Sequence, residues 1–196
     1  MLSRATRLIL CLPAIGACLA ALDASGQLLK DTKAPETFSA DAAAVGPSGS
    51  AATVLRIQID RYTSDQERDA FVDALKTGGH TAFLAALHKA PAAGSIAIKD
   101  EKWTLRWARQ QKTPNGRLIV VATDQPVYFV GGGLPQAKSR EGFDVAVVQL
   151  DVDEIGFGKG SMAPAARIKA GEPTGIQIED YAGQPVPLVS VKKVIS

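Results

Sequence analysis

The chain is poor in the residues that most often mark a chemical site, with two cysteines and two histidines among 196 residues. Both cysteines, Cys11 and Cys18, lie in an N-terminal apolar stretch, so a domain that begins after it has no thiol for a disulfide or a redox reaction. His80 and His88 are separated along one helix by about 12 Å of rise, too far to share a metal ion. We therefore expect no metal and no cofactor.

The chain also lacks an excess of one charge. Lysine and arginine total 22 and the acidic residues total 20, which gives a formal net charge of +2. A domain that binds nucleic acid or an anionic membrane surface needs a strongly basic face. The composition therefore predicts no nucleic-acid partner.

The N-terminus has the pattern of a secretory signal over residues 1–26. Arg4 and Arg7 precede an uncharged, mostly apolar run over 8–22, which is shorter than the roughly 20 residues of a membrane-spanning helix. Cleavage fits after residues 24–26 (Ala-Ser-Gly). Alternatively, residues 15–18 (Ile-Gly-Ala-Cys) resemble a bacterial lipobox, and Cys18 is then the lipidated residue. Both routes predict a bacterial protein that is exported and is either periplasmic or secreted. Contact with the membrane is expected only in the second route, through the lipid on Cys18.

Two further segments follow the signal. Residues 27–52 are dominated by Ala, Ser, Gly and Pro without periodicity, which predicts a flexible linker. The ordered domain is then expected over 53–196, with its first residue near Thr53.

Within this domain the patterns predict two helices among many strands. Ser64 and Glu67 form a capping box, apolar residues then recur at helical spacing, and Gly78-Gly79 ends the first helix. A second helix fits 80–89. Alternation and turn residues predict strands over 53–60, 95–98, 102–111, 117–123, 127–130, 143–152, 158–170, 175–181 and 186–194.

Strands joined by short turns pair antiparallel, and helices followed by a run of strands favour an α+β fold. We expect a twisted antiparallel β-sheet, either open or half-closed into a barrel, covered on one face by the N-terminal helix pair.

Three sequence segments are similar to a known family: LRWARQ before a Pro-Asn-Gly turn, RLIVVATDQP, and IEDYAGQPVPL. Together they resemble a family of exported bacterial proteins with no assigned function. The resemblance covers roughly residues 53–194 and implies the exported location and the domain limits. It implies no activity and no residue roles.

No catalytic motif is present, and no residue is assigned a catalytic role. A hydrolase that uses two carboxylates is an alternative, because several acidic residues follow predicted strands: Asp100, Glu101, Asp124, Asp144, Asp151, Asp153 and Glu154.

The candidates for ligand binding lie around one predicted strand. Strict alternation places Trp103 and Trp107 on one face, which is either core or an apolar groove lined also by Arg106, Arg109 and Tyr128. We expect a non-enzymatic exported domain that binds a small apolar ligand or an envelope protein. The alternatives are the carboxylate hydrolase and a structural component of the envelope.

Overall fold

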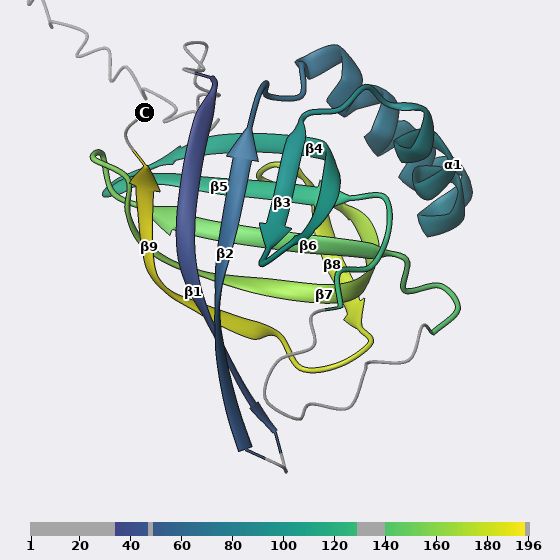
Figure 1. Ribbon diagram of the computed structural model, residues 1–196. Helices are drawn as coiled ribbons and strands as arrows, with labels where there is room; N and C mark the ends of the chain where they lie inside the picture. Colours follow the sequence, from purple (N-terminus) through teal and green to yellow (C-terminus); the bar gives the residue numbers. More distant parts are fainter. Residues whose placement is uncertain (1–33, 47–48, 129–139, 195–196) are drawn as a thin grey trace, which may run out of the picture.

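A computed structural model describes residues 34–46, 49–128 and 140–194 of the chain (Figure 1). The expected export signal and Cys18 lie outside these residues. Within the described ranges, no helix is long and apolar enough to cross a membrane. The elements in chain order are β1 (Glu36–Gly46), β2 (Gly49–Ile59), α1 (Asp65–Lys89), β3 (Gly94–Ile98), β4 (Glu101–Thr113), β5 (Gly116–Thr123), β6 (Val145–Val152), β7 (Phe157–Gly171), β8 (Gly175–Tyr181) and β9 (Val186–Val194).

The strands form a closed antiparallel barrel. The order β6-β5-β4-β3-β2-β1-β9-β7 returns to β6 through the β6–β7 pairing, so eight strands close on themselves. β8 pairs only with β7 and lies outside this circle. The expected half-barrel is therefore wrong in its extent, because β1 and β9 fill the gap between β2 and β7.

β1 lies entirely within the segment, residues 27–52, whose composition predicted a flexible linker. Its residues pair with β2 from Glu36↔Ile59 to Gly46↔Gly49, and with β9 from Thr37↔Val194 to Ala42↔Leu188. Alanine has low β-propensity, but ladder hydrogen bonds to two neighbours and burial of one face outweigh it. The ordered domain thus begins before Thr53.

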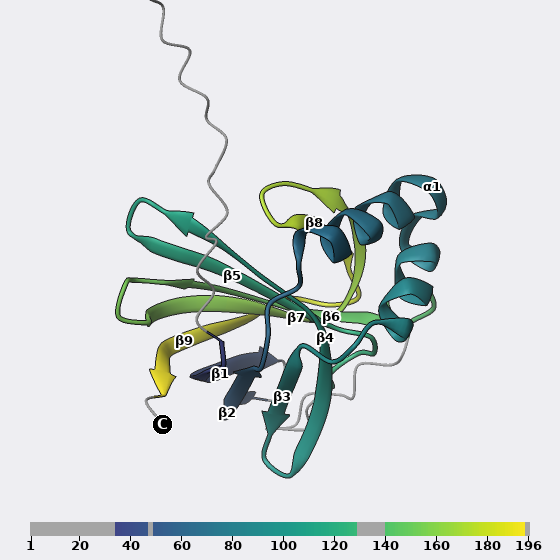
Figure 2. The same ribbon diagram turned by 90° about the horizontal axis from the view of Figure 1, so that it is seen from above.

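Two apolar cores lie on the two sides of the barrel wall. The inner core receives side chains from all eight barrel strands, among them Phe38 of β1, Ile57 of β2 and Leu150 of β6. The outer core lies between the wall and α1, and contains Phe71 and Phe83 of the helix. Figures 1 and 2 show α1 along the outside of the barrel, next to β8. β5 supplies the two cores alternately over residues 119–122, as a regular pleated strand does.

One kinked helix replaces the expected pair of helices. Ser64 caps α1 as predicted: its hydroxyl accepts the backbone N–H of Glu67, and the Glu67 carboxylate accepts the N–H of Ser64. The double glycine does not end the helix but bends it, since Gly79 has φ 63° and ψ −156°. This conformation is available essentially only to glycine.

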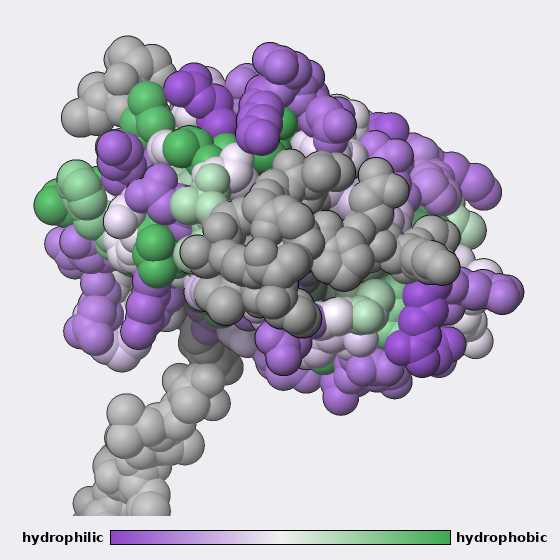
Figure 3. Space-filling view, turned by 60° about the horizontal axis from the view of Figure 1, so that its bottom comes forward, coloured by the Kyte–Doolittle hydropathy of each residue, from purple (hydrophilic) through white to green (hydrophobic). Residues whose placement is uncertain are grey.

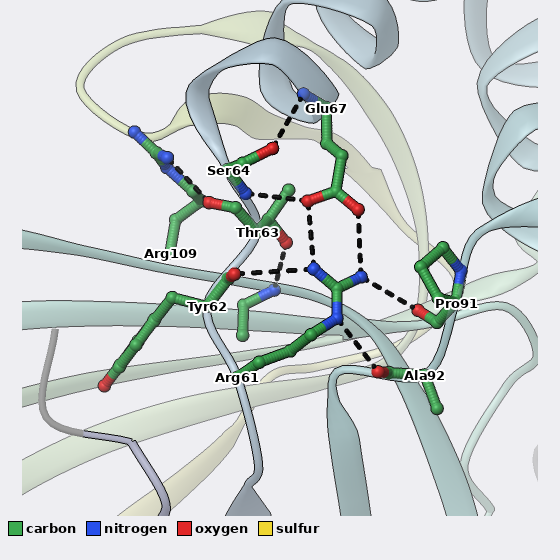
Figure 4. A network of polar contacts seen from close by, with 9 residues as sticks. Arg61, Tyr62, Thr63, Ser64, Glu67, Pro91, Ala92 and Arg109 are labelled. Carbon is green, nitrogen blue, oxygen red and sulfur yellow. Dashed lines mark hydrogen bonds and ion pairs between the residues drawn. The ribbon is translucent and has the colours of Figure 1, made fainter.

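The kink lets the two ends of α1 meet. The guanidinium of Arg61 binds the Glu67 carboxylate in the first turn, at 2.9 and 3.0 Å. The same guanidinium donates to the carbonyls of Pro91 and Ala92 beyond the last turn (Figure 4). A straight helix of 25 residues is about 37 Å long, so its ends could not share one side chain. α1 is thus a folded-back excursion between the neighbouring strands β2 and β3.

Candidate functional site

The structure separates the two tryptophans that the alternation placed together. β4 pairs with β5 through Leu105↔Thr123 and then Trp107↔Ala122, so a β-bulge lies between Leu105 and Trp107. The extra residue reverses the side on which later residues point. Trp103 therefore packs against the inner core, whereas Trp107 lies in the outer core. The prediction that both indoles share one face is wrong.

Trp107 is fully buried beneath α1. Its ring contacts Phe71 edge to face, with the centroids 5.5 Å apart, and no part of the side chain reaches solvent. The indole N–H has no hydrogen-bond partner among the described residues. The side chain therefore serves as packing between helix and wall and lines no open groove.

Arg106 and Arg109 secure the two ends of α1. Arg109 donates to the Thr63 carbonyl at 2.7 Å and to the Asp65 carboxylate at 2.8 Å, both at the start of the helix. Figure 4 shows Arg109 beside the capping residues. Arg106 donates at 2.9 Å to the carbonyl of Ala90, which follows the last turn. Arg106 lies within the bulge and Arg109 follows it, so one strand holds both ends of the folded helix.

Tyr128 lies away from these residues, near Asp144. Burial raises the pKa of the Tyr128 phenol, and the charge of Asp144 adds to the effect. The phenol oxygen is buried without a hydrogen-bond partner among the described residues. The five candidates thus lie in separate surroundings and form no common ligand site. Residues 127 and 128 are not in a strand, and the rest of the strand expected over 127–130 falls outside the described residues.

Sequence reasoning missed the pairing of His80 with Asp144. The backbone N–H of Ile168, at a bulge in β7, donates to His80 Nδ1 at 3.0 Å. The ring therefore carries its proton on Nε2, which faces Asp144 at 3.7 Å, beyond hydrogen-bond distance. Burial lowers the pKa of His80 and outweighs the opposite effect of Asp144. With Nδ1 occupied as an acceptor, this imidazole has no free lone pair for general-base chemistry.

His88, in contrast to the buried His80, lies partly in solvent beside a different carboxylate. Its Nδ1 lies 3.3 Å from the carboxylate of Asp124, and its side chain is about half exposed. The same carboxylate oxygen accepts from Arg106 Nε at 3.0 Å. Among the described residues, the hydrogen bonds of His88 include no hydroxyl that this imidazole could activate. Asp124 therefore joins Arg106 and His88 near the helix C-terminus, where positive charge is favourable.

A buried ionic cluster joins distant parts of the chain. The Glu36 carboxylate, at 1% exposure, binds Arg117 Nη1 at 2.8 Å and Lys193 Nζ at 3.0 Å. The Tyr62 hydroxyl donates to it at 3.2 Å, and Arg117 also donates to the Gln110 side chain. Burial alone raises the pKa of Glu36, but the two cations outweigh it and hold that pKa below its usual value. The cluster fixes the start of β1 to β5 and β9.

The inner core leaves no site for a ligand in the described conformation. An eight-stranded barrel has an interior just wide enough to be filled by side chains or to hold one small molecule. Here the large inward side chains have no exposed surface, so not even a water-sized sphere reaches them: Phe38, Leu55, Ile57, Ile59, Ile96, Leu105, Ile119, Leu150 and Met162. The barrel is a packed core.

The far end of the β1–β2 hairpin extends beyond the strands that flank it in the barrel. We call residues 43–46 of β1 and 49–54 of β2 the arm. β9 pairs with β1 only as far as Ala42, and β3 pairs with β2 only from Leu55 onward. Figure 1 shows the arm projecting beyond the end of the barrel. In the described chain, each strand of the arm is thus hydrogen-bonded on one side only.

Comparison with protein families, with curated proteins and with solved structures gives no match to this chain. Among the described residues, no group of three or more His, Cys, Asp or Glu side chains could hold a metal ion.

Proposed function

We propose that the chain is an exported, non-enzymatic binding domain that recognises an extended polypeptide strand at the arm. The observation that carries this proposal is the contrast between a filled barrel interior and an arm whose outer backbone edges pair with no other described residue. Exposed backbone N–H and C=O groups in a row are a template for another strand.

Strand addition needs no pocket. The main chain of the added strand supplies hydrogen bonds, and its alternate side chains contact the two faces of the ribbon. An isolated two-stranded ribbon is marginally stable in water, and a third strand stabilises it. The arm is thus better suited to a bound than to an unbound state.

The exposed side chains at the base of the arm support a polypeptide partner. Val54 and Val189 are about half exposed and lie on either side of Asp41, because Asp41 is paired with both. On the face seen in Figure 3, hydrophobic residues stand in small groups among hydrophilic ones. Small apolar groups beside an open edge suit the alternating side chains of a strand better than a broad hydrophobic surface.

Native mass spectrometry of the protein purified from its own host tests the proposal. We expect the chain to carry a polypeptide, and the variant Ala52→Lys to lose it, because Ala52 is an exposed arm residue. Ala52→Ser is the matched control and should retain the complex. An adduct with the mass of a lipid or another small apolar molecule would overturn the proposal. So would a chain that carries no polypeptide and also stays monomeric at high protein concentration.

A further inference from the structure

We propose that the strand bound by the arm is the arm of a second copy of this chain, paired along β2. This inference rests on the proposed function and names its partner. Within the described ranges, the β2 edge is the longer of the two unpaired edges of the arm, because six residues, Gly49–Val54, lie beyond the pairing with β3 that begins at Leu55. Only four residues of β1, 43–46, lie beyond its pairing with β9.

The residues of this edge are compatible with self-pairing. The arm contains no charged residue, and its β2 strand reads GSAATV. Protected edges commonly carry lysine, other charges, proline or a bulge, and none of these is present over Gly49–Val54. A partner strand that carries mainly acidic or mainly basic residues would find no opposite charge on this edge. A second copy meets no like-charge repulsion there, which is the usual obstacle to pairing a strand with itself.

A two-fold axis satisfies the geometry. Two β2 edges related by a two-fold axis perpendicular to the ribbon run antiparallel and keep equivalent faces on the same side. With Ala52 opposite Ala52, Val54 of each copy lies opposite Ser50 of the other. The result is a continuous four-stranded ribbon in which both β2 edges gain hydrogen-bond partners.

The expected interface is small. Two edges of six residues bury less than the roughly 1,200 Å² that stable interfaces reach, so association should be weak and dependent on concentration. A test therefore has to trap the contact as well as measure its affinity.

Disulfide trapping tests the register. Directly opposite residues of antiparallel strands have Cα atoms about 4.5–5.5 Å apart, within the range that a disulfide spans. Ala52→Cys, in a chain whose Cys11 and Cys18 are replaced by alanine, should form a covalent dimer under mild oxidation. Glu154→Cys is the matched control, because this exposed residue lies in the turn between β6 and β7. A dimer yield from Ala52→Cys no higher than from Glu154→Cys would overturn the inference.

Sedimentation equilibrium tests the same contact without a crosslink. The unmodified chain and Ala52→Ser should associate at concentrations up to about 500 µM, as expected for a small interface. Ala52→Lys should remain monomeric with an unchanged melting temperature, because it places two ammonium groups across the axis. Association of Ala52→Lys like the parent, or a parent that stays monomeric, overturns the inference. A monomeric parent that still carries another polypeptide, lost in Ala52→Lys, refutes only the second copy and leaves the proposed function standing.

Discussion

The substitution Gly79→Ala isolates the energy of the kink in α1. Gly79 has φ 63° and ψ −156°, in a region that residues with a side chain rarely enter. A Cβ atom built at this position meets no atom within 4 Å, so the substitution introduces strain in the backbone but no collision. Holding a residue in such a conformation costs on the order of 1–3 kcal/mol.

An effect on the unfolded chain partly offsets this cost. Alanine has fewer unfolded conformations than glycine, which favours the folded state by about 0.4–1 kcal/mol at positions that alanine tolerates. Subtracting this gain leaves an expected destabilisation of about 1–2 kcal/mol for Gly79→Ala. Urea unfolding followed by circular dichroism and tryptophan fluorescence measures the change.

Gly183→Ala is the matched control. A Cβ atom at Gly183 also meets nothing within 4 Å, and the backbone there is not in the left-handed region. This variant should be neutral or slightly more stable than the parent. Equal stability of Gly79→Ala and the parent would refute the argument that the folded-back course of α1 depends on this glycine.

Four other changes test the cores, the cap and the buried groups by urea unfolding. Glu36→Gln should lower the free energy of unfolding by about 3 kcal/mol, because it leaves the largely buried Arg117 guanidinium without a carboxylate partner. A loss of stability below about 0.5 kcal/mol would contradict the role of the cluster. Trp107→Ala should cost about 3–5 kcal/mol as lost packing, and the parent's tryptophan emission should not respond to added apolar ligands. Ser64→Ala should cost about 1 kcal/mol, and an unchanged curve would mean that the cap contributes nothing. Because the pKa of His80 is lowered in the folded state, the unfolded chain binds the proton more readily. The contribution of His80 to the free energy of unfolding is therefore complete above about pH 6.5 and is lost as the pH falls below that value. His80→Gln should flatten this pH dependence of stability between about pH 7 and 5.

Local patterns in the sequence predicted much of the barrel wall. The strands expected over 175–181 and 186–194 coincide with β8 and β9, and the capping box at Ser64 is confirmed. These features depend on alternation and on contacts between residues close in sequence, and both are visible in the chain itself.

The features that sequence reasoning missed depend on distant contacts. Alternation cannot reveal the bulge before Trp107, because the extra residue is defined by its partner strand. Glu36 and Arg117 lie 81 positions apart, and the local sequence around either residue does not predict their ion pair. The composition of residues 27–52 predicted a linker because alanine and glycine disfavour strands in isolation. Pairing with β2 and β9 supplied the missing stability.

The position of β9 determines when the barrel can close during biosynthesis. This last strand lies between β1 and β7 and pairs with both. Until it has been synthesised, residues 37–42 of β1 and 157–162 of β7 lack their partner strand, and among the described strands β1 pairs with β2 alone. The fold therefore cannot be completed while this segment is still missing. For the same reason, loss of β9 by truncation would give an open sheet prone to aggregation, since both exposed edges can pair with other chains.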